Sequence, residues 1–346
     1  MSTIKHNLKT AVMGAWARLA WHTPVGRLVD SCSERRLTIL YGHCVDDPDL
    51  NGELHADMKI GPGKLRAALE ALGRRFDFVT ISEGMERLVS GAPGRSMVAL
   101  SMDDGYRDNL LRLVPLLESV GAKATIFLES GAVVERRLPW LHALGWLDAE
   151  MGPLPLAQRL AEELAEVREA LLACEGSNRL KRILKYDADP AERDRVLATL
   201  VVERGGDPGG IVDRLYLSAE EAQRLAASDR IEIGGHTMNH PVLSRLSRGE
   251  QEHEIAGGAE ALGAALHGAD SGVVFAYPYG RSWDFDDASK GTAAEAGYAF
   301  AVTTHEGVNR PGADPYALRR VPIHGGSKLH IIWAEATGSF ELFRRS

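Results

Sequence analysis

The feature that most constrains the fold of this chain is a series of short apolar segments that alternate with segments of helical pattern. The candidate strands cover residues 37–42, 76–81, 97–102, 124–128, 231–234, 273–277, 298–303 and 318–323. Several of them are continuous apolar runs, which are typical of a parallel sheet covered on both faces. Because helical patterns lie between most of these strands, the sequence predicts an α/β fold built from βα repeats.

Local signals mark the ends of the predicted helices. Pro62 stands in the first turn of a helix over 62–73, where a missing backbone N–H costs nothing. A helix over 108–120 stops before Gly121. Ser218 and Ser247 each precede a glutamate by three residues, which is the pattern of a capping box. The second box opens a long helix that reaches about residue 266.

One part of the chain lacks the alternation. From about residue 131 to 215 the sequence shows only helical patterns, over 154–174, 178–185 and 190–203, with loop signals such as 205–210 at its flank. We interpret 131–215 as a helical insertion in a barrel domain that spans 37–346. A helical segment over 1–36 precedes that domain. The composition does not decide whether the insertion covers a site or pads the outside.

Composition narrows the class of protein. The chain has 346 residues, of which 45% are apolar and 25% charged, as in ordinary soluble globular proteins. A net charge of -8 gives no support to nucleic-acid binding. Cys32, Cys44 and Cys174 have no metal-like spacing, and their odd number argues against a disulfide framework, although a Cys32–Cys44 bridge stays open. Free cysteines fit a reducing compartment, so we expect a cytoplasmic protein.

The N-terminal segment has two interpretations. Lys5 and Lys9 precede an apolar stretch that faintly resembles a signal peptide, but Arg18 interrupts it. No segment approaches the ~20 apolar residues of a membrane span. We expect a helix carrying Trp16 and Trp21 to dock onto the protein's own body, and a peripheral contact with a membrane surface is the alternative.

Two polar clusters stand directly after predicted strands. One is Asp103-Asp104-Gly105, and the other is His236-x-x-x-His240, which has helical i,i+4 spacing and follows Gly234-Gly235. Each cluster alone is weak evidence for a metal site, since the first is a common turn sequence and the second is typical of a surface helix. Parallel strands bring their carboxyl ends to one face, where barrel enzymes place their chemistry. We therefore predict that the two clusters converge.

Two imidazoles and one carboxylate are an open catalytic set for a divalent metal. The second aspartate is then free to take a proton from water. Zinc suits these ligands best, and cobalt, nickel, manganese or iron are the alternatives. A third signal, 275–280, also ends a strand, and its sharp turn can aim the backbone N–H of Tyr279 at a developing oxyanion.

The three motifs, in this order, resemble the signature of the polysaccharide deacetylase family, the NodB-homology carbohydrate esterases. The family's Thr-Phe-Asp-Asp-Gly, His-Ser/Thr-x-x-His-Pro and Pro-Tyr-Gly correspond to residues 101–105, 236–241 and 278–280, with Ser101-Met102 in place of Thr-Phe. The similarity runs from about residue 37 to 323 and is broken by 131–215. It implies a distorted, TIM-like (β/α)7 barrel that hydrolyses N- or O-acetyl groups on sugars.

The resemblance also implies roles for single residues. By motif position, Asp103 resembles the catalytic base, and Tyr279 supplies the oxyanion N–H. The metal ligands implied are Asp104, His236 and His240. The chain departs from the family at Ala276, where an arginine that holds the base is often found, and Arg319 or Arg320 could replace it.

The proton donor is less well marked. His324 is the nearest match to the family's general acid in a late Leu-x-His motif, and His43, which ends the first strand, is another candidate. Asp284, Asp286 and Asp287 could orient the acid, but a solvated helix start is the simpler interpretation.

These residues lead to one main hypothesis and two alternatives. The main one is a metal-dependent hydrolase that removes N-acetyl groups from an amino sugar in a polysaccharide, an oligosaccharide or a lipid-linked glycan. The first alternative is a glycan-binding barrel that has lost catalysis. The second is a deformylase or amidase that acts on another C–N bond. The sugar, the metal and the oligomeric state stay open.

Overall fold

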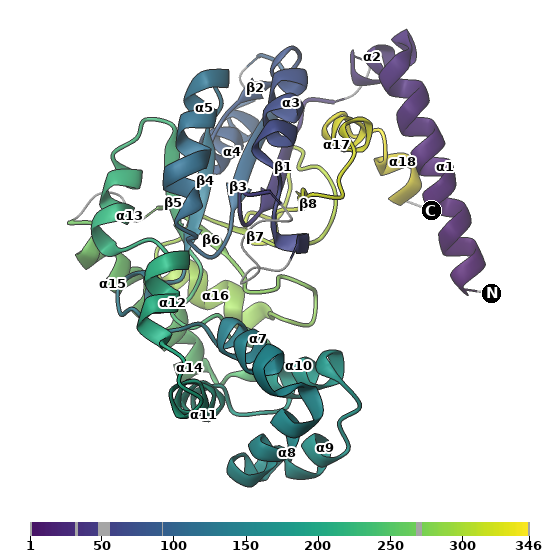
Figure 1. Ribbon diagram of the computed structural model, residues 1–346. Helices are drawn as coiled ribbons and strands as arrows, with labels where there is room; N and C mark the ends of the chain where they lie inside the picture. The colour runs from purple at the N-terminus through teal and green to yellow at the C-terminus, as the bar shows by residue number, and fades with distance from the viewer. Residues whose placement is uncertain (1, 32–33, 48–55, 92, 268–271, 345–346) are drawn as a thin grey trace.

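The computed structural model describes residues 2–31, 34–47, 56–91, 93–267 and 272–344 (Figure 1). Among these residues, seven parallel strands form a sheet in the order β7-β6-β5-β4-β3-β1-β8. The strands are β1 (Leu37–Gly42), β3 (Met97–Met102), β4 (Ala124–Leu128), β5 (Ile231–Gly235), β6 (Val274–Ala276), β7 (Phe300–Val302) and β8 (Arg320–Pro322). A parallel bridge from Val302 to Leu318, just before β8, brings the two edges together. The result is a nearly closed barrel.

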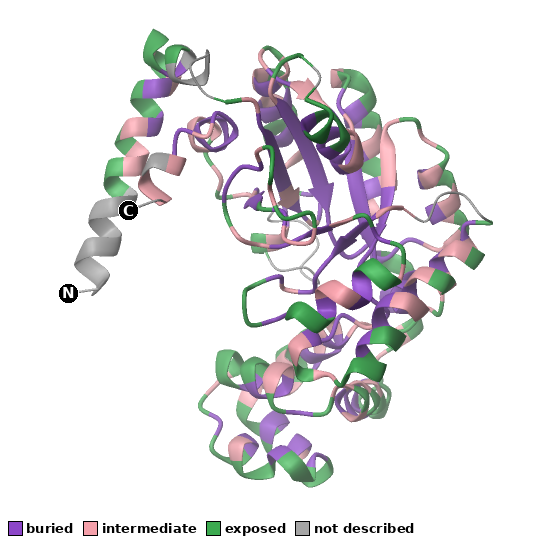
Figure 2. Ribbon diagram, turned by 180° about the vertical axis from the view of Figure 1, so that it is seen from behind, coloured by how far each residue is buried: buried purple, intermediate pink, exposed green. Residues whose placement is uncertain are grey.

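The inner strands confirm what their composition predicts. Every residue of β3 and β4 is buried, because side chains on both faces of the sheet are covered (Figure 2). The predicted strand over 76–81 is wrong in its second half. Only β2 (Asp77–Phe78) is extended, and it pairs with β3. Thr80 and Glu83 form a capping box that starts a helix at Ile81 instead.

Helices follow the strands around the barrel. They are α3 (Pro62–Gly73), α4 (Ile81–Val89), α5 (Val114–Val120), α6 (Ser130–Val133), α13 (Ala219–Ala226), α14 (Arg248–Glu252), α15 (Gly258–Ala265) and α16 (Asp287–Glu295). The predicted capping boxes at Ser218 and Ser247 are confirmed. π-helical turns at Asn109–Leu113 and His253–Gly257 interrupt the helices predicted over 108–120 and to about 266.

The segment between β4 and β5 is helical, as predicted. Its helices are α7 (Trp140–Met151), α8 (Pro153–Glu163), α9 (Arg168–Leu172), α10 (Ser177–Tyr186), α11 (Pro190–Glu203) and α12 (Pro208–Leu215). The single helix predicted over 154–174 is wrong, because the chain leaves the helical conformation at Leu164, whose side chain is buried in the core of this segment. The loop signal at 205–210 contains a helix start, since Asp207 caps α12 and Pro208 is its first residue.

Helices α7 to α11 share a hydrophobic core separate from that of the barrel, and the helices of the insertion lie together at one end of it (Figure 1). That end is where the strands finish, since Trp140 of α7 donates a hydrogen bond to the hydroxyl of Tyr279, just after β6, at 3.2 Å. The insertion therefore adjoins the carboxyl ends of the strands.

The N-terminal helices dock onto the C-terminal part of the chain. They are α1 (Ser2–His22) and α2 (Pro24–Ser31), and their neighbours are α17 (Leu329–Ala336) and α18 (Glu341–Arg344). The rings of Trp21 and Trp333 meet edge to face with centroids 6.0 Å apart. No described helix combines the length and the apolar character that a membrane crossing requires.

Two of the three cysteines lie in the described residues. Cys44 and Cys174 are buried free thiols, and burial raises the pKa of Cys44. Cys32, the third, lies outside the described residues.

Candidate active site

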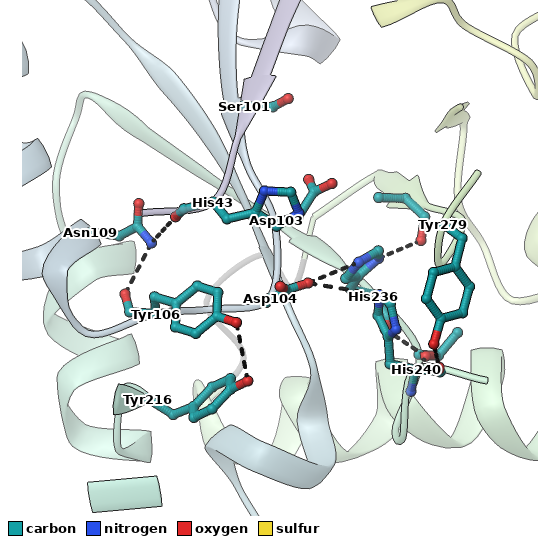
Figure 3. A network of polar contacts seen from close by, with 12 residues as sticks. His43, Ser101, Asp103, Asp104, Tyr106, Asn109, Tyr216, His236, His240 and Tyr279 are labelled. Carbon is teal, nitrogen blue, oxygen red and sulfur yellow. Dashed lines mark hydrogen bonds and ion pairs between the residues drawn. The ribbon is translucent and has the colours of Figure 1, made fainter. Parts of the chain in front are cut away.

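The side chains singled out in the motifs converge where the strands end (Figure 3). Asp103 and Asp104 follow β3, His236 follows β5, and Tyr279 follows β6. Arg320 is the first residue of β8, which pairs with β1. Because all of these strands are parallel, their carboxyl ends share one face of the barrel.

Asp103 is held by an arginine. Arg320 donates from its two terminal nitrogens to the two carboxylate oxygens of Asp103, at 2.7 and 2.9 Å. Its Nε donates to the carbonyl of Thr303 at 2.9 Å, and both members of the ion pair are buried. Burial raises the pKa of Asp103, but the guanidinium and the nearby His236 outweigh it and lower the pKa overall. Asp103 is therefore an ionised, rigidly oriented carboxylate.

The Asp103–Arg320 pair explains how the chain compensates for Ala276, which stands where the family often has an arginine. The arginine that holds Asp103 comes from β8, whereas Ala276 lies in β6. Of the two candidates, Arg320 points into the barrel, whereas Arg319 is exposed and donates to the carbonyl of Glu306. Neighbouring residues of a strand face opposite sides, so only one of the two can reach Asp103.

Asp104, His236 and His240 form a buried cluster whose ligand atoms all lie within 4.8 Å of one another. Oδ1 of Asp104 is 3.3 Å from Nε2 of His236 and 3.8 Å from Nε2 of His240. Burial raises the pKa of Asp104, but electrostatic interactions and hydrogen bonding with the neighbouring histidines, His43 first among them, lower it overall.

The hydrogen bonds around this cluster leave ligand atoms available to a cation. Nδ1 of His236 lies 2.7 Å from the carbonyl oxygen of Ala276, which can only accept, so this nitrogen carries the hydrogen. In the neutral ring, Nε2 then presents a lone pair toward Asp104. Among the described residues, neither Oδ1 of Asp104 nor Nδ1 of His240 has a hydrogen-bond partner, although both atoms are buried. One carboxylate and two imidazoles facing each other in this way suit a divalent metal.

The two histidines meet through a turn and not through a helix, so the helical interpretation of their spacing is wrong. Residues 236–240 are non-helical, and Thr237 and His240 have positive φ angles of 63° and 54°. The Thr237 hydroxyl accepts a hydrogen bond from the His240 N–H at 3.0 Å. The carboxylate of Glu254 accepts from the N–H groups of Met238 and Asn239, at 3.0 and 2.9 Å.

Glu254 therefore shapes the metal cluster without belonging to it. Nothing in its sequence context separates it from the other acidic residues of the helical segment after the histidines. Only the fold reveals its role, because the contact joins residues 15 and 16 positions apart in the chain.

Tyr279 lies beside the cluster, with its ring centroid 4.5 Å from that of His240 (Figure 3). Its φ angle is 61°, and its carbonyl accepts a hydrogen bond from the Thr304 hydroxyl at 2.8 Å. Within the described residues, the Tyr279 N–H has no hydrogen-bond acceptor. This amide is free to donate to an incoming oxygen.

The two candidate proton donors have different surroundings. His43 follows β1 and lies next to Asp103 and Asp104 (Figure 3). His324 accepts a hydrogen bond at Nδ1 from the Gly326 N–H at 3.2 Å. It lines a cavity of about 630 Å³ between α1, α17 and the end of β8, and this cavity contains none of the cluster's ligands.

The acidic residues after the third motif have separate roles. Asp286 caps α16 and accepts from the Ser289 N–H at 2.9 Å, which confirms the helix start. Asp284 is fully buried, so its interpretation as a solvated residue is wrong. It accepts a hydrogen bond from the Tyr186 hydroxyl at 2.9 Å and lies 3.4 Å from Nζ of Lys185, both on α10 of the insertion.

Comparison with known proteins identifies the family. The sequence profile for polysaccharide deacetylases matches residues 90–301, which include the first three motifs. The chain belongs to the polysaccharide deacetylase family. A curated relative, YxkH of Bacillus subtilis, also carries the family's name and is 29% identical over 107 residues. That match covers 31% of this chain, and the chain spans 37% of the relative's length.

Solved structures share the fold of this polysaccharide deacetylase family member. The Streptococcus pyogenes deacetylase PplD, solved in complex with acetate, has a TM-score of 0.57 and 18% identity, and the match covers 88% of this chain and 99% of PplD. IcaB from Ammonifex degensii has a TM-score of 0.57 and 17% identity, over 88% of this chain and 98% of IcaB. At these identities, the likeness supports the barrel architecture alone.

Proposed function

We propose that this protein removes N-acetyl groups from an amino sugar in a polysaccharide, an oligosaccharide or a lipid-linked glycan. The observation that carries the proposal is the buried Asp103–Arg320 ion pair beside the Asp104, His236 and His240 cluster. An ionised carboxylate next to a metal cluster is the pair of groups that amide hydrolysis by water requires.

A metal held by Asp104, His236 and His240 would polarise the acetyl carbonyl and make a water molecule more acidic. Zinc is our choice for this ion, since zinc prefers two imidazoles and a carboxylate with open positions. The cluster lacks thiolate ligands, which keeps other first-row divalent metals compatible with it.

Two different side chains then carry out the two proton transfers, one from the water and one to the amine. Asp103, oriented by Arg320, takes a proton from the water that attacks the acetamide carbonyl carbon. The Tyr279 N–H donates a hydrogen bond to the oxygen on which negative charge develops. The C–N bond breaks, acetate leaves, and the amine nitrogen receives a proton from a histidine.

We propose His43 as that histidine, because it lies next to the two aspartates, and we keep His324 as its competitor. His43→Ala and His324→Ala form a matched pair for this assignment. The true donor's variant should lose about 10²–10⁴-fold in kcat, and the other should stay close to wild type. Equal losses in both would contradict a single donor.

The main test measures acetate release from N-acetylglucosamine oligomers by the metal-loaded protein. Asp103→Asn should keep about one equivalent of metal while acetate release falls about 10²–10⁴-fold. Its melting temperature should fall, because the buried Arg320 guanidinium loses its charge partner, but unfolding should stay cooperative. Near-normal turnover in this variant would reject Asp103 as the base. Release of formate or ammonia in place of acetate would assign the site to another acyl group or leaving group.

We also propose a peripheral membrane contact through α1 and α2. Leu19 and Leu28 are 49% and 65% exposed there, and Val12 lies seven residues before Leu19, on the same helix face. Arg18 adds an exposed positive charge. An apolar face flanked by cationic side chains suits an anionic lipid surface. A cytoplasmic location, indicated by the free cysteines, stays a prediction.

Co-sedimentation of the full chain with phosphatidylglycerol vesicles tests this contact. Leu19→Glu/Leu28→Glu should reduce the bound fraction several-fold, because burying a carboxylate in the headgroup region is costly. Leu172→Glu, at an exposed site on α9, is the control. Equal binding by all three proteins, or none by wild type, would reject the contact.

A further inference from the structure

The loop after Tyr279 presents a large aromatic side chain to solvent. Trp283 is 59% exposed, whereas the other large aromatic side chains of this part of the barrel, such as Phe275, Tyr277 and Phe285, are buried. An exposed indole close in the chain to a candidate active site offers a large, flat apolar face to a ligand.

The ring of Trp283 is also held in place. Its Nε1 donates a hydrogen bond to the hydroxyl of Tyr186 at 3.1 Å, and its carbonyl accepts from the Ser244 hydroxyl at 2.6 Å. The guanidinium of Arg281 lies 5.6 Å from the ring centroid. Fixing a side chain before a ligand arrives removes an entropy cost from binding. The indole ring of Trp283 is thus fixed in one orientation before a ligand binds.

A chain of contacts links this indole ring to the active site. The Tyr186 hydroxyl donates to Oδ1 of Asp284 at 2.9 Å, and Nζ of Lys185 lies 3.4 Å from the same oxygen. Nζ of Lys185 also lies 3.3 Å from the ring centroid of Tyr279. Two neighbouring residues of α10 therefore connect Trp283 to the active site. Tyr186 bonds to Trp283 and Asp284, and Lys185 contacts both Asp284 and Tyr279. The barrel loop and the insertion build this region together.

We propose that Trp283 is a sugar-binding platform for the glycan unit next to the acetylated one, with a pyranose ring stacked on the indole and Arg281 available to its hydroxyl groups. The C–H bonds on the face of a pyranose carry partial positive charge, which the negative face of an aromatic ring attracts. The inference deepens the proposed function and rests on it. It assigns the insertion a role in selecting oligomers over single sugars.

The experiment compares acetate release from N-acetylglucosamine and from its pentamer. Trp283→Ala should raise KM for the pentamer about tenfold with little change in kcat, because a contact made equally in ground and transition state affects binding alone. Activity on the monomer should not change. Trp283→Phe should recover part of the loss. Leu172→Ala truncates another exposed apolar side chain, at 62% exposure on α9, and should match wild type.

Tyr186→Phe tests the support of the platform. It removes the hydroxyl that joins Trp283 to Asp284, so KM for the pentamer should rise two- to fivefold, again with no effect on the monomer. Thermal unfolding of each variant checks that the fold is intact.

The outcomes separate the two proposals. If the metal-loaded wild type releases no acetate from either substrate, the proposed function fails, and the platform fails with it. If wild type is active and Trp283→Ala leaves KM for the pentamer unchanged, only the platform is rejected. An equal loss on monomer and pentamer would also reject it, since Trp283 would then act through the fold.

Discussion

Arg320 lowers the pKa of Asp103 and fixes its orientation by contacts that no other residue type makes. Its guanidinium uses two parallel hydrogen bonds on Asp103 and a third on the Thr303 carbonyl, in a buried setting. A planar fork matches a carboxylate in a way that an ammonium group cannot. A positive charge alone is therefore not sufficient at position 320 to hold the Asp103 carboxylate in one orientation.

Arg320→Lys should reduce acetate release about 10–100-fold while metal content stays near one equivalent. Lysine keeps the charge but loses the bidentate geometry, so Asp103 is no longer held in one orientation. Steady-state kinetics and metal analysis of the purified variant check this. Arg319→Lys, at the exposed neighbouring position, should match wild type. Full activity in Arg320→Lys would show that charge suffices.

Asp108 carries a pH-dependent cost to stability. Burial raises its pKa to about 6, and the negative charge of Asp46 adds to that effect. The folded state thus binds a proton more tightly than the unfolded state, and stability falls as pH rises from about 4 through 6. Asp108→Asn keeps the acceptor for the Val45 N–H without the charge.

The Asp108→Asn variant should be about 1–2 kcal/mol more stable than wild type at pH 7 and equal to it at pH 4. Urea unfolding at both pH values measures the difference. An advantage of the same size at both pH values would show that the effect comes from packing and not from protonation.

At the scale of elements, the strand β5 depends on glycine for its close approach to its neighbours. A Cβ built on Gly234 would lie 2.6 Å from the ring of Phe127 and 2.7 Å from the carbonyl oxygen of Val274. The second contact is with backbone of β6, which cannot move without disturbing the sheet. Glycine at this position lets the strands that carry His236 and Tyr279 lie side by side.

Gly234→Ala should therefore destabilise the protein by about 1–3 kcal/mol through overpacking. Gly145→Ala is a control that should stabilise the protein. Gly145 lies inside α7, and a Cβ there meets nothing within 4 Å. That variant should gain about 0.5–1 kcal/mol. Chemical unfolding of both variants measures these differences, and an unchanged Gly234→Ala would show that the strands can separate at no cost.

At the scale of the whole molecule, a metal ion held by Asp104, His236 and His240 would couple binding to stability. These three residues come from the turn after β3 and from the turn after β5, which are separated by about 130 residues of chain that include the insertion. An ion bound only by the folded state stabilises it by about 2.7 kcal/mol at a hundredfold excess over Kd.

Zinc should accordingly raise the melting temperature of the metal-free protein by several degrees. His236→Ala/His240→Ala should lose this response, whereas Asp103→Asn should retain it, since Asp103 is not a ligand. Differential scanning calorimetry with and without a chelator makes the comparison. A shift of equal size in the double variant would place the zinc elsewhere.

The motifs and the positions of most strands along the chain could be predicted because they depend on local pattern. Continuous apolar runs marked β3 and β4, and the Asp103-Asp104-Gly105 turn was visible directly after the first of them. The turn at 236–240 could not be predicted, since two residues with positive φ and a carboxylate from a later helix stabilise it. Spacing alone suggested a helix there.

The sequence by itself determined the alternation of strands and helices, the helical nature of the insertion and the polar residues that follow the strands, since each depends on neighbours within a few positions. Only the tertiary structure decided which arginine holds Asp103, where the insertion docks and why Asp284 is buried. These contacts join residues about 100 to 217 positions apart. Their geometry depends on the closure of the barrel, which no local window of the sequence contains.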